Sequence, residues 1–238
     1  MAEARGRSSD EERDMRVAVI IPALNEEKAI GVVIDEIPRP LVGRVIVVDN
    51  GSSDRTAEVA REHGADVVRE EQRGYGNACL RGMAELDGEE VVVFLDGDHS
   101  DFPEEIVDLV APIEKGEADM VIGSRPLGNP ERGALTPQQV FGNRVACAMI
   151  RILFRHRYTD LGPFRAIRAE ALESLGMVDR TYGWTVEMQV KALRKGLRVR
   201  EVPVRYRRRI GKSKVSGTVR GTLGAGYKII TTILRYAR

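Results

Sequence analysis

Short runs of valine and isoleucine alternate with polar segments along the first half of the chain. Five such runs occupy residues 17–21, 44–49, 66–69, 90–96 and 119–124. Because these runs are apolar on both faces, they are typical of strands in a parallel sheet that helices cover. Segments of helix length separate them, at residues 26–36, 54–63, 75–86 and 103–115. The alternation predicts a doubly wound α/β fold with a mostly parallel central sheet flanked by helices.

The second half of the chain begins with a loop rich in proline and glycine between Pro126 and Pro137. Its pattern predicts helices at residues 138–154, 169–174 and 185–195 and strands at residues 164–167 and 198–206. We interpret this half as an extension of the same sheet, since no linker marks a second domain. The expected organisation is a disordered extension at residues 1–15, one α/β domain at residues 16–214 and a C-terminal helix at residues 215–238.

The C-terminal helix is expected to be amphipathic and basic. Apolar residues recur in it at roughly helical spacing, at Val219, Leu223, Ile230 and Leu234. Basic residues lie among them, at Arg220, Lys228, Arg235 and Arg238. Such a helix either packs on the body of the protein or lies at a membrane surface, where its basic side chains meet lipid phosphates.

Charge adds to this picture because it is unevenly distributed. The 238 residues include 37 Lys and Arg against 36 Asp and Glu. From Met188 to the end there are 15 basic residues and one acidic residue, Glu201, a net charge of +14. The 22 basic and 35 acidic residues before Met188 give −13. The tail is therefore expected to face phosphates, a nucleic acid or an anionic membrane surface.

The N-terminus and the cysteines bear on the compartment. The first 15 residues are polar and lack the apolar stretch of a signal peptide. Cys79 and Cys147 lie 68 residues apart, which fits neither a disulfide framework nor a metal site. No apolar run approaches the roughly 20 residues needed to cross a bilayer. We expect a cytoplasmic protein that contacts the cytoplasmic membrane face only peripherally.

Three predicted strands end in acidic, polar sequences. The first runs into PALNEE, the second into DNGSSD and the fourth into DGDHSD. Because ligands of open α/β sheets bind beyond the carboxyl ends of the strands, these carboxylates are expected to converge on one crevice. They would repel one another without a cation, so a hard divalent metal, Mg²⁺ or Mn²⁺, is implied. Asp96 and Asp98 flank Gly97, which lets the backbone approach a ligand closely.

Other nucleotide-binding motifs are incomplete. Asp49 ends the second strand, where an acidic residue commonly meets a ribose or a base, yet no GxGxxG follows the first strand. The GKS sequence at Gly211 lacks the first glycine of a Walker A motif. His63, His99 and His156 lie far apart without metal-ligand spacing. These gaps disfavour a dinucleotide-dependent oxidoreductase and a P-loop NTPase.

Seven ordered segments are specific when they are taken together. They are IIPALNEE, VIVVDNGSSDRT, RGYGNACLRG, VVFLDGDHSD, VIGSR, TDLGPFRAIR and VPVRYRRRIGKSKVSGT. From about Val17 to Thr218 the chain resembles the family 2 glycosyltransferases, and within them the dolichyl-phosphate mannose synthase and polyprenyl-phosphate hexose synthase branch. The resemblance implies a GT-A fold and transfer of a hexose from a nucleotide-sugar of the GDP-mannose or UDP-glucose type to a lipid-linked phosphate.

The resemblance also implies roles for individual residues. Those at the nucleotide are Pro22, Asn25, Glu26 and Asp49. Those at the metal, which bridges the diphosphate, are Asp96, Asp98 and Ser100. Those at the acceptor phosphate are Arg125 and Arg144, and those that close over the diphosphate and acceptor are Arg209 and Lys214. Ser100 stands where mannose synthases commonly have glutamine, so Asp101 is an alternative third ligand. The family's DxxSGF motif reads DLGPF from Asp160, which leaves the acceptor or sugar specificity open.

The residue types suit this chemistry. A metal at the DxD sequence, with Arg209 and Lys214, neutralises the charge that develops on a diphosphate leaving group. A lipid phosphate, whose second pKa is about 6, is already largely ionised at neutral pH and needs no strong general base. Asp160 and Glu187 are therefore expected to position an arginine or sugar hydroxyls. In-line attack would invert the anomeric carbon.

Two alternatives remain. A related family 2 transferase that uses a soluble or protein-bound hydroxyl acceptor would need Asp160 or Glu187 as a base. A module that binds nucleic acid or an anionic surface would use the basic tail. Few aromatic residues, among them Tyr206 and Tyr227, interleave the charges of the tail, so no nucleic-acid partner is expected.

Overall fold

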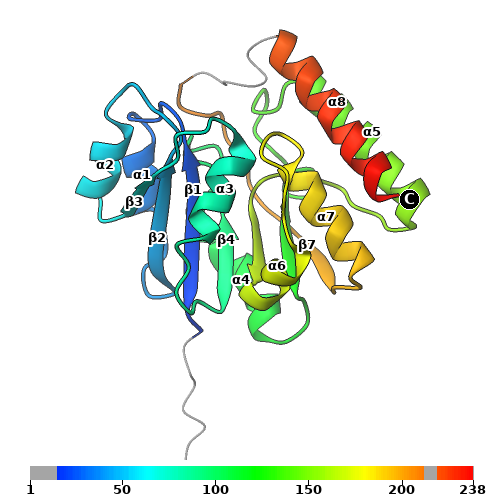
Figure 1. Ribbon diagram of the computed structural model, residues 1–238, viewed down its shortest axis with the longest axis horizontal. Helices are drawn as coiled ribbons and strands as arrows, with labels where there is room; N and C mark the ends of the chain where they lie inside the picture. The colour runs from blue at the N-terminus through cyan, green and yellow to red at the C-terminus, as the bar shows by residue number, and fades with distance from the viewer. Residues whose placement is uncertain (1–14, 212–218, 238) are drawn as a thin grey trace, which may run out of the picture.

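Alternating strands and helices build one central sheet (Figure 1). The structure, a computed structural model, describes residues 15–211 and 219–237. The strands are β1 (Val17–Ala23), β2 (Val42–Asp49), β3 (Asp66–Arg69), β4 (Val91–Phe94), β5 (Met120–Ser124), β6 (Arg165–Arg168) and β7 (Val199–Pro203). The helices are α1 (Ile30–Asp35), α2 (Thr56–Glu62), α3 (Tyr75–Met83), α4 (Ile106–Glu114), α5 (Pro137–Phe154), α6 (Ala169–Leu175), α7 (Trp184–Arg194) and α8 (Val219–Tyr236). The predicted α/β fold with a mostly parallel sheet is confirmed.

The strand order is β3-β2-β1-β4-β6-β5-β7. All neighbouring pairs are parallel except those of β6, which runs antiparallel to both β4 and β5. The second half of the chain therefore inserts a strand into the sheet and does not only extend its edge. The carboxyl ends of β1, β2 and β4 share the upper edge in Figure 1, where the acidic sequences lie.

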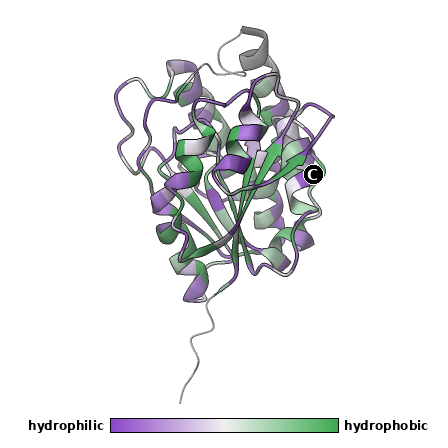
Figure 2. Cartoon of the chain, turned by 90° about the vertical axis from the view of Figure 1, so that its left-hand side faces the viewer, coloured by the Kyte–Doolittle hydropathy of each residue, from purple (hydrophilic) through white to green (hydrophobic). Residues whose placement is uncertain are grey.

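Two apolar layers cover the sheet. Along β1, Val19 and Ile21 pack with α1 and α4 on one face, whereas Ile20 packs on the other face, because successive side chains alternate. On that second face Trp184 of α7 is fully buried and meets Phe94 edge to face, with ring centroids 4.6 Å apart. Figure 2 shows the hydrophobic residues concentrated on the strands and the hydrophilic ones on loops and outer helix faces.

Helices α5 and α8 lie side by side at one end of the molecule (Figure 1). Helix α8 packs on the body through Ile233, which is fully buried. Two polar contacts also hold it: Lys228 pairs with Asp179 at 2.9 Å, and the Tyr236 hydroxyl donates to Glu187 at 2.8 Å. Among the described helices, none is both long and apolar enough to span a membrane.

Candidate active site

The ends of β1 and β2 are joined by hydrogen bonds between their loops. Asn25 adopts a left-handed conformation with φ 53°, its amide donates to the Ser52 hydroxyl at 2.9 Å, and its side-chain oxygen accepts from the Ser53 amide at 2.8 Å. Asp49, at the end of β2, accepts from the Ser52 amide at 3.0 Å. Pro22 lies within β1 beside Val48. These contacts fix one wall of the predicted nucleotide site.

Arg209 connects this wall to the DxD sequence that follows β4. Its two terminal nitrogens pair with Glu26 at 2.9 Å and with Asp98 at 3.0 Å. The segment after β7 lies over the DxD turn, because the Ile210 amide donates to the Asp98 carbonyl and the Arg207 amide to the Ser100 carbonyl, both at 2.9 Å. The structure thus brings Glu26, Asp98 and Arg209 together, whereas Lys214 lies outside the described residues.

Asp96 and Asp98 form an electrostatically strained pair. Burial and the neighbouring Asp98 raise the pKa of Asp96 to about 7. The Tyr75 hydroxyl donates to Asp96 at 3.2 Å, which compensates only part of this cost. Asp98 accepts from both the amide and the hydroxyl of Ser100. A positive charge at this turn would stabilise both carboxylates.

The residues at this turn fit a divalent cation. They offer the oxygen ligands that Mg²⁺ and Mn²⁺ prefer. Asp101 is buried beside them, and neither of its carboxylate oxygens has a hydrogen-bond partner in the described part of the chain. Among the same residues, no three acidic, histidine or cysteine side chains converge on one point. Asp96 and Asp98 would therefore share the ion with the diphosphate oxygens, as Mg²⁺ commonly does in nucleotide sites. The choice between Ser100 and Asp101 stays a prediction.

Two further residues, Asn50 and Tyr75, shape the predicted donor side, although the sequence did not predict them there. The Asn50 side chain donates to the carbonyls of Glu70 and Gln72 and accepts from the Gly74 amide at 2.8 Å, which holds the loop before α3. Tyr75, the next residue, reaches Asp96. Gly74 has a φ of 148°, and a Cβ there would lie 2.2 Å from the Arg180 carbonyl oxygen. The two glycines of the RGYG sequence at residues 73–76 were the sequence feature that could have predicted this close approach of two backbone segments.

Arg125 and Asp160 form the core of the predicted acceptor side. Nε and a terminal nitrogen of Arg125 each donate to a separate oxygen of Asp160 at 2.7 Å, and the Arg125 amide adds a third bond at 3.0 Å. Burial disfavours the charge of Arg125, but Asp160 outweighs it and raises the pKa of the guanidinium. The Tyr206 ring lies 5.1 Å from this guanidinium. Asp160 thus holds Arg125 in one orientation.

A pocket of about 650 Å³ opens between this pair and α5. Four arginines line it, Arg125, Arg144, Arg151 and Arg157. Apolar side chains line it as well, including Pro130, Leu135, Val140 and Ala148. Asp160, already paired with Arg125, is the one carboxylate among the described lining residues. The pocket suits an anionic ligand with an apolar part, and sequence reasoning had anticipated only two of its arginines.

Glu187 is held in a separate network. It is fully buried on α7 and accepts from the Asp179 amide at 2.7 Å, the Tyr236 hydroxyl at 2.8 Å and Lys191 at 2.8 Å. None of these partners belongs to the predicted site. The contacts tie α7 to α8 and to the loop before α7, so the structure does not bring Glu187 to Arg125 or Asp160.

Comparisons with known proteins identify the family of the chain. The model of the family Glycosyl transferase family 2 matches residues 18–176. An uncharacterized glycosyltransferase of Mycobacterium tuberculosis is 41% identical over 210 residues, covering 87% of this chain and 93% of the relative. The dolichyl-phosphate hexose transferase of Haloferax volcanii is 32% identical over 203 residues, covering 84% of this chain and 86% of the relative.

Solved structures extend the likeness to the fold. Glucosyl-3-phosphoglycerate synthase from Mycobacterium tuberculosis, in complex with Mn²⁺, UDP and phosphoglyceric acid, superposes with a TM-score of 0.77 at 25% identity, covering 94% of this chain and 78% of that one. A complex of the same enzyme with Mg²⁺ and UDP gives a TM-score of 0.75 at 25% identity, with 94% and 79% covered. The chain is therefore a glycosyltransferase of family 2, with a GT-A-like α/β fold.

Proposed function

We propose that the chain is a metal-dependent, inverting hexosyltransferase that moves a hexose from a nucleotide-sugar to a polyprenyl or dolichyl phosphate at the cytoplasmic membrane face. The donor is of the GDP-mannose or UDP-glucose type. The observation that carries this proposal is the arginine-lined pocket, whose Arg125 lies close enough to Asp96 of the DxD sequence to lower the pKa of that carboxyl, against the larger rise that burial causes. The dolichyl-phosphate hexose transferase relative supports the same acceptor class.

The donor side supports a nucleotide diphosphate. Asn25, Glu26 and Asp49 line the loops at the ends of β1 and β2, where nucleotides bind in folds of this kind. Arg209 bridges two carboxylates, and its Nε is buried without a hydrogen-bond partner in the described residues. A diphosphate would replace the carboxylates as the partner of this guanidinium. When bound, the divalent cation supplies further neutralisation of the leaving charge.

The acceptor side supports a nucleophile that arrives already ionised. The candidate bases are both engaged, Asp160 with Arg125 and Glu187 with Lys191. His99 bonds to Glu36 at 3.0 Å, away from the arginine pocket. A phosphate monoester with a second pKa of about 6 needs no base at neutral pH. Guanidinium groups match its oxygens in pairs, which suits Arg125 and Arg144.

The proposed reaction is an in-line displacement. An oxygen of the acceptor phosphate attacks the anomeric carbon of the hexose, and the bond from that carbon to the diphosphate oxygen breaks. Its electron pair leaves on the diphosphate, beside Arg209. The products are a lipid-phosphate hexose of inverted configuration and a nucleoside diphosphate, and no proton has to be removed from the ionised acceptor.

A soluble acceptor is the second candidate. The glucosyl-3-phosphoglycerate synthase structure was determined with phosphoglyceric acid, a small anion that an arginine-lined pocket also suits. Transfer to a hydroxyl of such a molecule requires a base, and the paired states of Asp160 and Glu187 weigh against it.

A panel of donors and acceptors tests the proposal. The full chain is incubated with GDP-mannose or UDP-glucose, Mg²⁺ or Mn²⁺, and either a polyprenyl phosphate or phosphoglyceric acid. We expect a sugar label in the organic phase only with the polyprenyl phosphate and a divalent metal. Transfer confined to phosphoglyceric acid would contradict the proposed acceptor and favour the second candidate.

A further inference from the structure

Basic residues that have no carboxylate ion-pair partner among the described residues are concentrated around α5. The 28 residues from Arg132 to Thr159 contain five arginines and no Asp or Glu. The arginines are Arg132, Arg144, Arg151, Arg155 and Arg157. None of them forms an ion pair with a carboxylate of the described residues, so their charge is available to an external anion.

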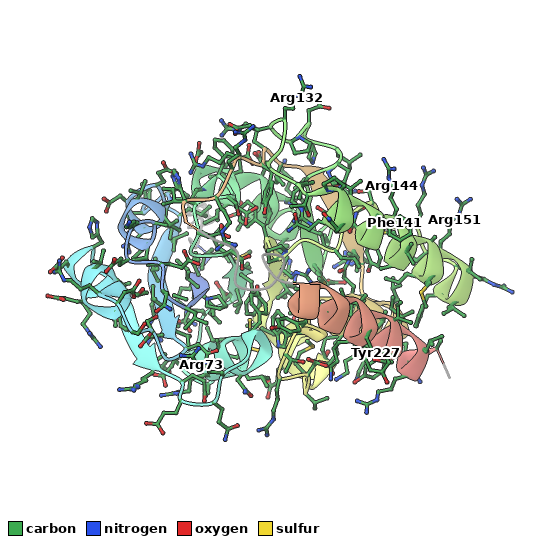
Figure 3. The ribbon with its side chains drawn as sticks, turned by 90° about the horizontal axis from the view of Figure 1, so that it is seen from above. Arg73, Arg132, Phe141, Arg144, Arg151 and Tyr227 are labelled. Atoms are coloured by element: carbon green, nitrogen blue, oxygen red, sulfur yellow. The ribbon has the colours of Figure 1, made fainter. Side chains whose placement is uncertain are left out.

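Helix α5 also exposes large apolar side chains on the side that carries these arginines. Phe141 is 70% exposed and Ile152 is 77% exposed, more than any other large apolar residue described except Tyr227. Phe141, Arg144, Ala148, Arg151 and Ile152 follow one another at helical spacing, and we call them the α5 outer face. Figure 3 shows Arg144 and Arg151 pointing away from the body from the same side of α5, with Arg132 projecting from the preceding loop.

The α5 outer face borders the arginine-lined pocket. Arg144, Ala148 and Arg151 belong to both. A phosphate that approaches along this face therefore meets Arg144 and Arg151 before it reaches Arg125. Apolar side chains beside a row of arginines are typical of a helix that lies in the plane of an anionic membrane surface.

We propose that the α5 outer face docks on an anionic lipid surface, with Phe141 and Ile152 among the lipids and the arginines at the headgroup phosphates. This inference rests on the proposed function, because a lipid-phosphate acceptor has to enter the pocket from a membrane. A second copy of the chain fits the face less well, since a two-fold contact would set arginines against arginines. The exposed Phe141 and Ile152 favour lipid over nucleic acid.

Insertion can be measured with a fluorescent side chain at position 141. The chain has one tryptophan, Trp184, which is fully buried, so a Phe141→Trp variant reports the environment of the α5 outer face. We expect its emission to shift to shorter wavelength with vesicles of equal parts phosphatidylglycerol and phosphatidylcholine, and not with phosphatidylcholine alone. Salt should reverse the shift. An unchanged spectrum at low salt would overturn the proposal.

Two sets of variants separate the contribution of the inserted apolar side chains to vesicle binding from that of the arginine charges. The double change Phe141→Ser and Ile152→Ser should weaken co-sedimentation with the anionic vesicles by about tenfold or more. Arg155→Asn should weaken it by about fivefold. Arg155 has a φ of 56°, which asparagine tolerates, so the backbone should not change. Matched controls are Val32→Ser and Val107→Ser, which are 42% and 43% exposed on other helices. Equal losses in these controls would overturn the proposal.

Turnover distinguishes a failure of this inference from a failure of the proposed function. With a short, water-soluble prenyl phosphate, the double serine variant should keep the wild-type rate, and it should lose rate only with a long-chain acceptor in vesicles. If the wild type uses the short acceptor but binds no vesicles, the docking inference is wrong and the proposed function stands. A dimer that the double change converts to a monomer, or RNA binding without vesicle binding, would also overturn it.

Discussion

The arginines after β7 and the arginines of α5 differ in whether a carboxylate neutralises them. After β7, Arg205, Arg207 and Arg209 each pair with a carboxylate, at distances of 2.6 Å, 2.5 Å and 2.9 Å. On α5, Arg144 and Arg151 have no such partner in the described chain. The first group holds the segment after β7 over the predicted donor site, and in the proposed function Arg209 exchanges its carboxylate partners for a diphosphate. The second group has its charge available for an incoming phosphate.

The same difference explains the uneven charge of the sequence. Seven basic residues of the tail pair with carboxylates that precede it, or in one case with Glu187 of the same helix. They are Lys191, Arg198, Arg200, Arg205, Arg207, Arg209 and Lys228. The excess of acid before Met188 and of base after it is thus partly an internal match between two packed parts. A net charge counted along the chain does not by itself locate a surface that binds phosphates.

The largest effect on activity is expected from removal of Asp98, the DxD carboxylate that pairs with Arg209. Asp98→Ala should lower kcat by about three orders of magnitude, because it removes a proposed metal ligand and one partner of Arg209. Asp98 lies in a turn, so the melting temperature should change little. Steady-state rates and thermal melts check this, and near wild-type activity at limiting metal would contradict the assignment.

Removal of the bridging guanidinium should have a smaller effect. Arg209→Ala is expected to lower kcat by about a hundredfold, since it deletes one proposed electrostatic contact to the leaving diphosphate. Arg205→Ala is the matched control, because its partners Glu104 and Glu105 lie outside the donor site. Equal losses in the two variants would mean that both arginines only hold the segment after β7 in place.

Burial of Asp96 beside Asp98 should lower the free energy of unfolding of the metal-free protein at high pH. Burial raises the pKa of Asp96 from 3.8 to about 7 in the folded chain, so the folded state favours the protonated carboxyl. The stability from Asp96 is therefore complete below about pH 4, where the carboxyl is protonated in both states, and is lost as the pH rises through 7. In metal-free protein, Asp96→Asn should therefore match the wild type near pH 4 and be more stable by about 4 kcal/mol near pH 8. Urea unfolding with a chelator at both pH values measures this. A constant difference between the two pH values would contradict it.

The arginines without partners should act on the acceptor alone. Arg144→Ala is expected to raise the acceptor KM by about tenfold and to leave nucleotide-sugar affinity unchanged, since it removes one charge-assisted contact to a phosphate. Calorimetry with the donor and kinetics with the acceptor separate the two effects. If donor affinity falls while the acceptor KM stays constant, the two sides of the site have been assigned wrongly.

The sequence predicted the elements well because their signals are local. Apolar runs and helix-length segments located β1 to β5 and α2 to α5 within a few residues. The direction of β6 was not predictable, because a strand buried on both faces reads alike in parallel and antiparallel sheets. Arg151 and Arg157 were missed because no motif marks them and only the fold brings them beside Arg125. The network that joins Glu187 to Tyr236 is likewise a tertiary contact between distant segments.

The central claim is that the acceptor is a phosphate that needs no base. The most direct measurement offers the wild type equal amounts of a polyprenyl phosphate and of the corresponding polyprenol, with nucleotide-sugar and Mg²⁺, and identifies the labelled products by mass. We predict that the hexose is found only on the phosphate and that Arg144→Ala lowers this product. Transfer to the polyprenol at a comparable rate would contradict the account, because it would require a base that the paired Asp160 and Glu187 do not supply.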